Sequence, residues 1–297
     1  MSPSAAPRHI LLATDLSSRS DRALDRAVVI ARQWQARLIA LTVVENEPID
    51  AATSVLARAT GQIGGAHLRK ARAERRLRAD VLGESDLPLM PMVEQGPVTD
   101  TVLTVATAED CGLIVTGVAR NEALSRVVLG STVDALVRRS HVPLLVVRNR
   151  ARAPYRQVIV ASDFSESSRH TLQRVANDLF PEADITLFHA FGNPYPAIGG
   201  IDQTQLRADG LAQAEREAEA FIEACHLPET TRARLRTWME HGDPGLLLNT
   251  HGQEHPDDLV VLGTKQRGGV LGLLLGSVAQ RLLELADNDV LVVPHGA

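Results

Sequence analysis

The chain contains the same sequence pattern twice, and this repeat constrains its fold more than any other feature. The segment ILLATDLSSRSDRAL (residues 10–24) matches VIVASDFSESSRHTL (residues 158–172), with Asp15 and Asp163 at the same place in each. The segments that end the two halves also match, at nearly the same offset along the chain. This offset is far longer than the repeat of a solenoid, which is about 20 to 50 residues. We therefore expect two whole globular domains in tandem.

Length and composition agree with two domains and exclude several classes of partner. The 297 residues divide into domains of about 150, which we place at residues 1–150 and 151–297. A net charge of −5 gives no general attraction to nucleic acid or to an anionic membrane, and 3% aromatic residues leave few platforms for stacking bases. Cys111 and Cys225 occupy non-equivalent positions of the repeat, so no disulfide framework is expected. With neither a signal-peptide pattern nor a spanning apolar run, we expect a cytoplasmic protein without nucleic-acid or membrane partners.

Strand-like and helix-like segments alternate in each half. Runs rich in Val, Ile and Leu alternate with segments whose apolar residues recur at helical spacing. This order is typical of parallel β-α-β units, and the nearly unbroken apolar runs indicate a sheet covered by helices on both faces. The expected strands are 9–14, 37–44, 89–94, 113–116, 143–148, 158–162, 184–189, 232–240, 259–262 and 290–293. The expected helices are 20–34, 54–82, 98–109, 131–139, 167–180, 205–224, 244–250 and 277–286.

Two features of each copy fall at the carboxyl ends of the expected strands, where open parallel sheets bind their ligands. One is the aspartate that ends the first strand, Asp15 or Asp163, whose carboxylate can accept a hydrogen bond from a ribose hydroxyl. The other is a loop that closes at a helix start, in Gly130-Ser131-Thr132 and in Gly276-Ser277-Val278. Free backbone N–H groups and the helix dipole favour phosphate there. The alternative is that these aspartates and serines only cap helices.

Together, the order and spacing of these residues resemble the universal stress protein family, whose pattern is a strand-1 aspartate followed by G-x2-G-x9-G-S/T between strand 4 and helix 4. The resemblance implies an α/β fold of two tandem Rossmann-like domains, each a five-stranded parallel sheet flanked by helices. It also implies an internal pseudo-dimer that pairs strands 144–147 and 290–293, and it leaves a homodimer of chains open. The nucleotide-binding residues that it implies are Asp15, Gly117, Gly130, Ser131 and Thr132 in the first copy, with Val43 or Val44 near adenine, and Asp163, Gly263, Gly276, Ser277 and Val278 in the second, with His189 or Ala190 near adenine.

Both copies depart from the family pattern at its second glycine, where Arg120 and Gln266 stand. A side chain at this position either blocks the approach of phosphate or requires a backbone angle that it disfavours. Against this, the glycines at 268–269 supply flexibility close by. Lys265 and Arg267 have no acidic neighbour in their loop, whereas the first loop also carries an acid. Phosphate is therefore expected mainly in the second copy.

Two further patterns have simpler interpretations. His251 and His255 fit the H-x-x-E-H spacing of a zinc site, but Gly252 and Pro256 predict that the helix ends within the motif. Solvated histidines are the preferred interpretation. The basic stretch at 67–78 is interpreted as a solvated helix face rather than a nucleic-acid site.

Since neither a nucleophile elbow nor a Walker loop occurs, and no catalytic set recurs in the two copies, we assign no catalytic residue and no metal ligand. We predict a non-enzymatic stress-response regulator that binds ATP or a related nucleotide with Mg²⁺, mainly in the second domain, and that acts on an unidentified protein partner. The alternative is a nucleotide-free scaffold for protein interaction with degenerate sites. Slow ATP hydrolysis is the third option.

Overall fold

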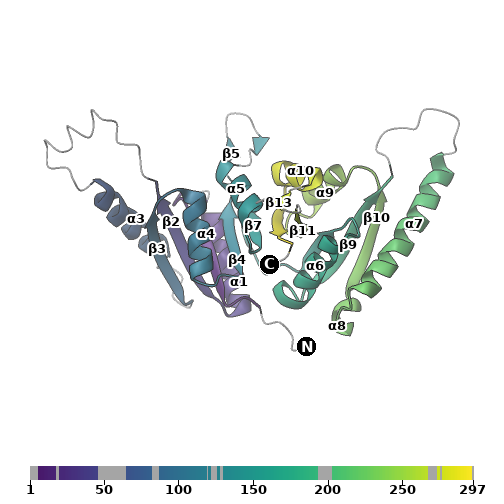
Figure 1. Ribbon diagram of the computed structural model, residues 1–297, viewed down its shortest axis with the longest axis horizontal. Coiled ribbons are helices and arrows are strands. Elements are labelled where there is room, and N and C mark those ends of the chain that lie inside the picture. The colour runs from purple at the N-terminus through teal and green to yellow at the C-terminus, as the bar shows by residue number, and fades with distance from the viewer. Residues whose placement is uncertain are drawn as a thin grey trace.

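A single sheet runs through the whole chain, with helices on both of its faces (Figure 1). The computed structural model describes residues 6–17, 20–45, 65–81, 87–118, 120–121, 126–127, 130–192, 203–266, 273–274 and 276–295. The strands that form this sheet in the first half are β1 (His9–Ala13), β2 (Arg37–Val44), β3 (Leu89–Gln95), β4 (Leu113–Gly117) and β7 (Leu144–Val147). Those of the second half are β8 (Gln157–Ala161), β9 (Asp184–Phe191), β10 (Leu235–His241), β11 (Leu259–Gly263) and β14 (Asp289–Val293).

The ten strands follow the order β10-β9-β8-β11-β14-β7-β4-β1-β2-β3, so each half repeats one parallel five-strand arrangement. The halves meet at β7 and β14, which pair antiparallel with Leu145 opposite Leu291 and Val146 opposite Val290. These strands are apolar and buried throughout, as expected for the centre of a sheet covered on both faces. The predicted pairing of the last strands within one chain is confirmed.

Helices divide into two layers, each of which covers the sheet across both halves. One layer holds α1 (Asp21–Trp34), α3 (Gly65–Val81), α6 (Glu166–Arg174) with its π-helical turn η2 (Val175–Leu179), and α7 (Gln203–Ala224). The other holds α4 (Val98–Ala108), α5 (Ser131–Arg139), α9 (Pro244–Glu254) and α10 (Ser277–Leu285). In Figure 1, α3 and α7 lie at the outer ends of the molecule, while α5 and α10 lie near its centre. Among the described residues, no helix has both the length and the apolar composition needed to cross a bilayer.

Several elements differ from the sequence predictions. The helix expected over 54–82 is observed as α3, and residues 54–64 lie outside the described part of the chain. A short helix, α8 (Glu229–Arg232), occupies the start of the strand expected at 232–240. The two glycine loops contain short hairpins, which are β5 (Arg120–Asn121) with β6 (Arg126–Val127), and β12 (Lys265–Gln266) with β13 (Leu273–Leu274). Each hairpin reaches the other half, since β6 contacts α10 and β13 contacts α5.

The helix expected over 244–250 extends further, since α9 continues to Glu254, but it ends within the His251–His255 motif as predicted, because His255 is no longer helical. Gly252 serves close packing within this helix, since a Cβ on it would lie 2.1 Å from the side-chain oxygen of Asn288. The amide of Asn288 in turn donates to the carbonyl of His255, at the helix end. His251 Nε2 lies 2.8 Å from Asp258 Oδ2, and the described residues contain no group of three His, Cys, Asp or Glu placed to hold a metal.

A buried polar cluster joins the two halves at the start of β14, around Asp289. Asp289, which is 1% exposed, accepts hydrogen bonds at Oδ1 from the backbone N–H groups of Arg148 and Asn149, at 2.7 and 2.9 Å. Its Oδ2 accepts from the Tyr155 hydroxyl at 2.6 Å and lies 3.3 Å from Nε of Arg26 in the first half. The guanidinium of Arg26 also lies over the Tyr155 ring, 3.9 Å from its centre. The cluster therefore fixes the first half, the linker and the second half against one another.

Both cysteines are buried, with Cys111 3% and Cys225 1% exposed. Burial, together with the nearby charges of Glu109 and Asp110, raises the pKa of Cys111 to about 12. Burial also raises the pKa of Cys225 to about 11. Because the thiolate is the reactive form, we expect neither thiol to react with Ellman's reagent at about pH 8 in the folded protein. Both should react in guanidinium chloride, and rapid labelling without denaturant would contradict this description.

Candidate functional site

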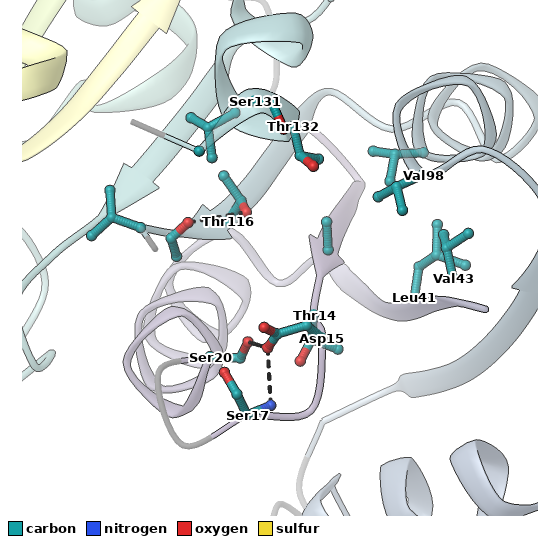
Figure 2. A pocket seen from close by; sticks show the side chains of 16 residues that line it. Thr14, Asp15, Ser17, Ser20, Leu41, Val43, Val98, Thr116, Ser131 and Thr132 are labelled. Carbon is teal, nitrogen blue, oxygen red and sulfur yellow. Dashed lines mark hydrogen bonds between the residues drawn. The ribbon is translucent and has the colours of Figure 1, made fainter. Parts of the chain in front are cut away.

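Two cavities of similar size open at the carboxyl ends of the parallel strands, one in each half. The first has a volume of about 370 Å³ and the second of about 350 Å³. Each is bounded by the first, second and fourth strands of its half and by the helix that follows the glycine loop. This is the point at which the strand order reverses, where ligands of doubly wound sheets are bound. Figure 2 shows the first cavity from close by.

The residues predicted to bind a nucleotide gather around these cavities in both copies. Those lining the first are Asp15, Gly117, Gly130, Ser131 and Thr132. Those lining the second are Asp163, Gly263, Gly276, Ser277 and Val278. Of the residues expected near adenine, Val43 lines the first cavity and His189 and Ala190 line the second, whereas Val44 is not among the described residues that line either. Segments far apart in the sequence are thus brought together twice, in equivalent ways.

The aspartate of the first cavity is held by the turn that follows β1. Its Oδ1 accepts from the backbone N–H of Ser17 at 2.9 Å and from the hydroxyl of Ser20 at 2.6 Å (Figure 2). Partial burial raises the pKa of Asp15, but the hydrogen bonds from Ser17 and Ser20 outweigh burial and leave the pKa below its ordinary value. The carboxylate therefore remains ionised at neutral pH, as an acceptor for a ligand hydroxyl requires.

The second cavity repeats this arrangement. Oδ1 of Asp163 accepts from the backbone N–H of Ser165 at 3.1 Å and from the hydroxyl of Ser168 at 2.8 Å. The residue after each aspartate is left-handed, with φ of 59° at Leu16 and 57° at Phe164. A bulky residue in this conformation costs about 1 to 2 kcal/mol, and such strain is concentrated at functional sites. The carboxylate of Asp163 thus both supports this turn and lines the cavity.

The glycines that precede α5 and α10 do not owe their presence to backbone strain. Gly130 and Gly276 have φ of −61° and −62° in ordinary extended conformations, which any residue can adopt. A Cβ added to Gly276 would meet nothing within 4 Å, so packing does not exclude a side chain either. Gly263 differs, because a Cβ there would lie 2.5 Å from the hydroxyl of Thr171. Gly263 is therefore required for packing, whereas Gly276 leaves space open at the helix start.

Each cavity also has an apolar side that the sequence reasoning missed. Those apolar residues are Leu41, Val98 and Val102 in the first cavity and Phe188, Pro244 and Leu262 in the second. Hydroxyl groups at the strand ends were missed as well, at Thr14 and Thr116 in the first cavity and at Ser162 in the second, and so was the hydroxyl of Ser167 at the start of α6. Alternation along the strands was the available signal, but it assigns such residues to the core rather than to a cavity at the strand ends.

The departures from the family pattern fall at the start of the hairpins, with Arg120 in β5 and Gln266 in β12. The structure describes the backbone of these residues and of Lys265. Arg267 and the glycines at 268–269 lie outside the described residues. The predicted preference of phosphate for the second copy thus stays a prediction from the sequence.

Comparison with known proteins agrees with the repeat. The sequence model of the universal stress protein family matches residues 7–148 and, a second time, residues 154–294. The chain belongs to the universal stress protein family. A universal stress protein of Mycolicibacterium smegmatis is 27% identical over 234 residues, which are 72% of each chain. Universal stress protein MJ0531 of Methanocaldococcus jannaschii is 24% identical over 151 residues, which are 50% of this chain and 86% of the relative.

Solved structures match this universal stress protein over both halves at once. The crystal structure of protein PA1789 from Pseudomonas aeruginosa PAO1 matches 97% of this chain and 93% of its own, with a TM-score of 0.64 and 19% identity. That of a universal stress protein from Archaeoglobus fulgidus matches 97% of this chain and 99% of its own, with a TM-score of 0.63 and 16% identity. At these identities the likeness concerns the fold, and it confirms the predicted tandem Rossmann-like architecture.

Proposed function

We propose that this universal stress protein is a non-enzymatic stress-response regulator that binds ATP or a related nucleotide, mainly in the second cavity. The observation that carries this proposal is the same in both copies. A carboxylate and an uncapped helix start face one cavity, whose other side is apolar. Ribose, phosphate and base need these three surfaces in this arrangement.

The helix starts supply the phosphate site. Both α5 and α10 begin at a glycine, and neither helix start carries a side-chain hydrogen bond that caps it. The first N–H groups of a helix have no partner within the helix, and together with the helix dipole they favour an anion. In the second cavity, the backbone of Ser277 and Val278 would hold phosphate oxygens, and Gly276 would let them approach.

The carboxylate and the apolar side supply the remaining contacts. Asp163 would accept from a ribose hydroxyl, and the base would lie against the apolar residues from β9 and α9. Two basic residues in the second glycine loop, Lys265 and Arg267, support preferential binding of phosphate in this copy. Mg²⁺ would be carried by the phosphates of the nucleotide, since the described residues contain no cluster of metal ligands.

The position of the hairpins indicates how binding of a nucleotide would change a surface that a partner protein contacts. The hairpin of the second glycine loop contacts α5 of the first half, so a change in that loop on binding would be transmitted across the pseudo-dimer. The nucleotide shifts the loop between its two conformations only if it binds one of them more tightly than the other.

The departures at Arg120 and Gln266 favour the second candidate function, a scaffold with empty sites.

The Asp163→Asn protein tests the ribose contact. We expect its affinity for Mg-ATP in the second cavity to fall by about tenfold or more, because a hydrogen bond to a charged group is lost. Glu166→Gln is the matched control, since Glu166 is exposed, pairs with Arg169 and does not line the described cavity. Isothermal titration calorimetry measures both affinities. Equal affinity in the two variants would contradict the placement of ribose at Asp163.

A further inference from the structure

The two outer helices, α3 and α7, carry opposite charge although they occupy equivalent places in the repeat. Each lies between the second and third strands of its half, and Figure 1 shows the two helices at opposite ends of the molecule. The sequence of α3 contains six basic and two acidic residues, whereas that of α7 contains two basic and five acidic residues. One end of the molecule therefore presents a basic helix and the other end an acidic one.

Glutamates form an acidic stripe on the outer side of α7. Glu215, Glu219 and Glu223 recur every four residues and are exposed, while the helix packs on the core through Ala218 and Phe221. None of the three glutamates makes a hydrogen bond or an ion pair with another described residue. Like charges at this spacing repel one another and destabilise a helix. The acidic stripe thus lacks a counter-charge within the described part of its own chain.

Arginines form a basic stripe on the outer side of α3. Arg72, Arg75 and Arg78 recur every three residues and are exposed, while Leu77 is 1% exposed and holds the helix on the core. These arginines also make no hydrogen bond or ion pair with another described residue. At about 1.5 Å per residue, the arginines extend over about 9 Å of helix and the glutamates of α7 over about 12 Å. The two stripes therefore match in length and in number of charges.

The acidic helix also carries exposed apolar side chains. Leu206 and Leu211 of α7 are 54% and 36% exposed, and Leu211 precedes Glu215 by four residues, in line with the acidic stripe. Burial of such side chains against another molecule is favourable. The outer side of α7 thus combines unpaired charges with apolar surface, as the rim and the centre of a protein contact do.

We propose that copies of this chain associate end to end, with the basic stripe of α3 in one copy against the acidic stripe of α7 in the next. The contact joins two different surfaces, so it leads to rings or open chains of molecules rather than to a closed dimer. Exposed ion pairs are weak and are screened by salt, so the association is expected to be weak and to depend on ionic strength. Neither helix lines the described cavities, and the inference does not rest on the proposed function.

Sedimentation equilibrium of the full chain tests this association. We expect the average mass to rise with protein concentration at about 0.02 M NaCl and to fall to that of a monomer at about 0.5 M NaCl, where the Debye length is only about 4 Å. A protein that stays monomeric at the lower salt concentration would overturn the inference and leave α3 and α7 as surfaces for unlike partners.

Charge reversal identifies the two surfaces. One variant combines E215K, E219K and E223K in α7, and the other combines R72E, R75E and R78E in α3. Each alone should remain monomeric, because its two ends then carry like charge. An equimolar mixture should associate again, since the basic α7 of one variant meets the acidic α3 of the other. Association of either variant alone, or a mixture that stays monomeric although both variants are folded, would overturn the inference.

The matched control reverses exposed charges in the other helix layer and its neighbouring loop, and it combines E254K, D257K and E284K. It changes the net charge as much as the α7 variant does, yet it should associate as the parent chain does. Loss of association in this control would overturn the assignment to α3 and α7. If circular dichroism shows that a reversed variant is unfolded, the milder E215Q, E219Q and E223Q combination should weaken association about tenfold, and unchanged association would contradict the contact.

Discussion

The Asp289→Ala protein is expected to lose about 3 to 5 kcal/mol of its free energy of unfolding, the typical cost of breaking a buried ion pair by removing one partner. Asp289 and Arg26 are 1% and 2% exposed, and their side chains lie 3.3 Å apart. Without the carboxylate, the guanidinium of Arg26 stays buried without its counter-charge. Two backbone N–H groups and the Tyr155 hydroxyl lose their acceptor as well.

Tyr155 remains a donor to this cluster at every ordinary pH. Its burial, and then the negative charge of Asp289, hold the pKa of Tyr155 well above its usual range. The hydroxyl therefore keeps its proton, and Tyr155→Phe should destabilise the protein by a smaller amount, about 1 to 3 kcal/mol. Since the cluster joins both halves and the linker, its loss should lower the stability of the whole pseudo-dimer rather than of one domain.

An exposed ion pair within the same chain is the matched control. Asp100 and Arg139 lie 2.6 Å apart but are 55% and 51% exposed. Solvent screens such a pair, so Asp100→Ala should cost at most about 1 kcal/mol. Urea denaturation, followed by circular dichroism, measures both variants against the parent chain. Equal losses of stability in Asp289→Ala and Asp100→Ala would contradict the role of the buried cluster.

The Gly276→Val protein is expected to lose binding of Mg-ATP in the second cavity while it keeps its fold. The backbone at Gly276 has φ of −62°, and a Cβ there meets nothing within 4 Å. The branched side chain would therefore occupy the space at the helix start that phosphate needs. We expect at least a hundredfold loss of affinity, about 2.7 kcal/mol. The free energy of unfolding should change by no more than about 1 kcal/mol, as for other substitutions at a helix N-cap.

Gly263→Ala is the control, and in contrast to Gly276→Val it is expected to destabilise the fold. The added Cβ would lie 2.5 Å from the hydroxyl of Thr171 and 3.2 Å from that of Ser167, both on α6. Crowding of this kind destabilises a core by about 1 to 3 kcal/mol. Calorimetry and thermal melting of the two variants thus separate a glycine that leaves room for a ligand from one that packs. Unchanged affinity of Gly276→Val for Mg-ATP would contradict the placement of phosphate at the start of α10.

The repeat made the fold predictable, because a pattern that occurs twice in alternating strands and helices permits few architectures. The resemblance to the universal stress protein family implied the central pairing of β7 with β14 and the sets of residues that line the two cavities. The cluster around Asp289 could not be predicted in this way. In the repeat, the counterparts of Asp289 and Tyr155 are Pro143 and Pro7, so the interface breaks the symmetry on which the prediction rested.

Local breaker residues predicted the end of α9 within the His251–His255 motif, but not why a glycine stands inside the helix. The partner that explains Gly252 is Asn288, which is remote in the sequence. The orientation of the His189 ring was equally hidden, because it depends on the carbonyl of Ser162, just after the neighbouring strand β8. Such features depend on tertiary contacts, which a single sequence does not reveal.

The most direct test of the account is a calorimetric titration of the full chain with Mg-ATP, read for stoichiometry. We predict at least one binding site per chain, with the tighter site lost in Gly276→Val and retained in Gly130→Val. Two sites would mean that Arg120 and Gln266 do not prevent binding in either copy. No heat up to about millimolar ATP, together with an unchanged melting temperature, would contradict nucleotide binding and support the scaffold instead.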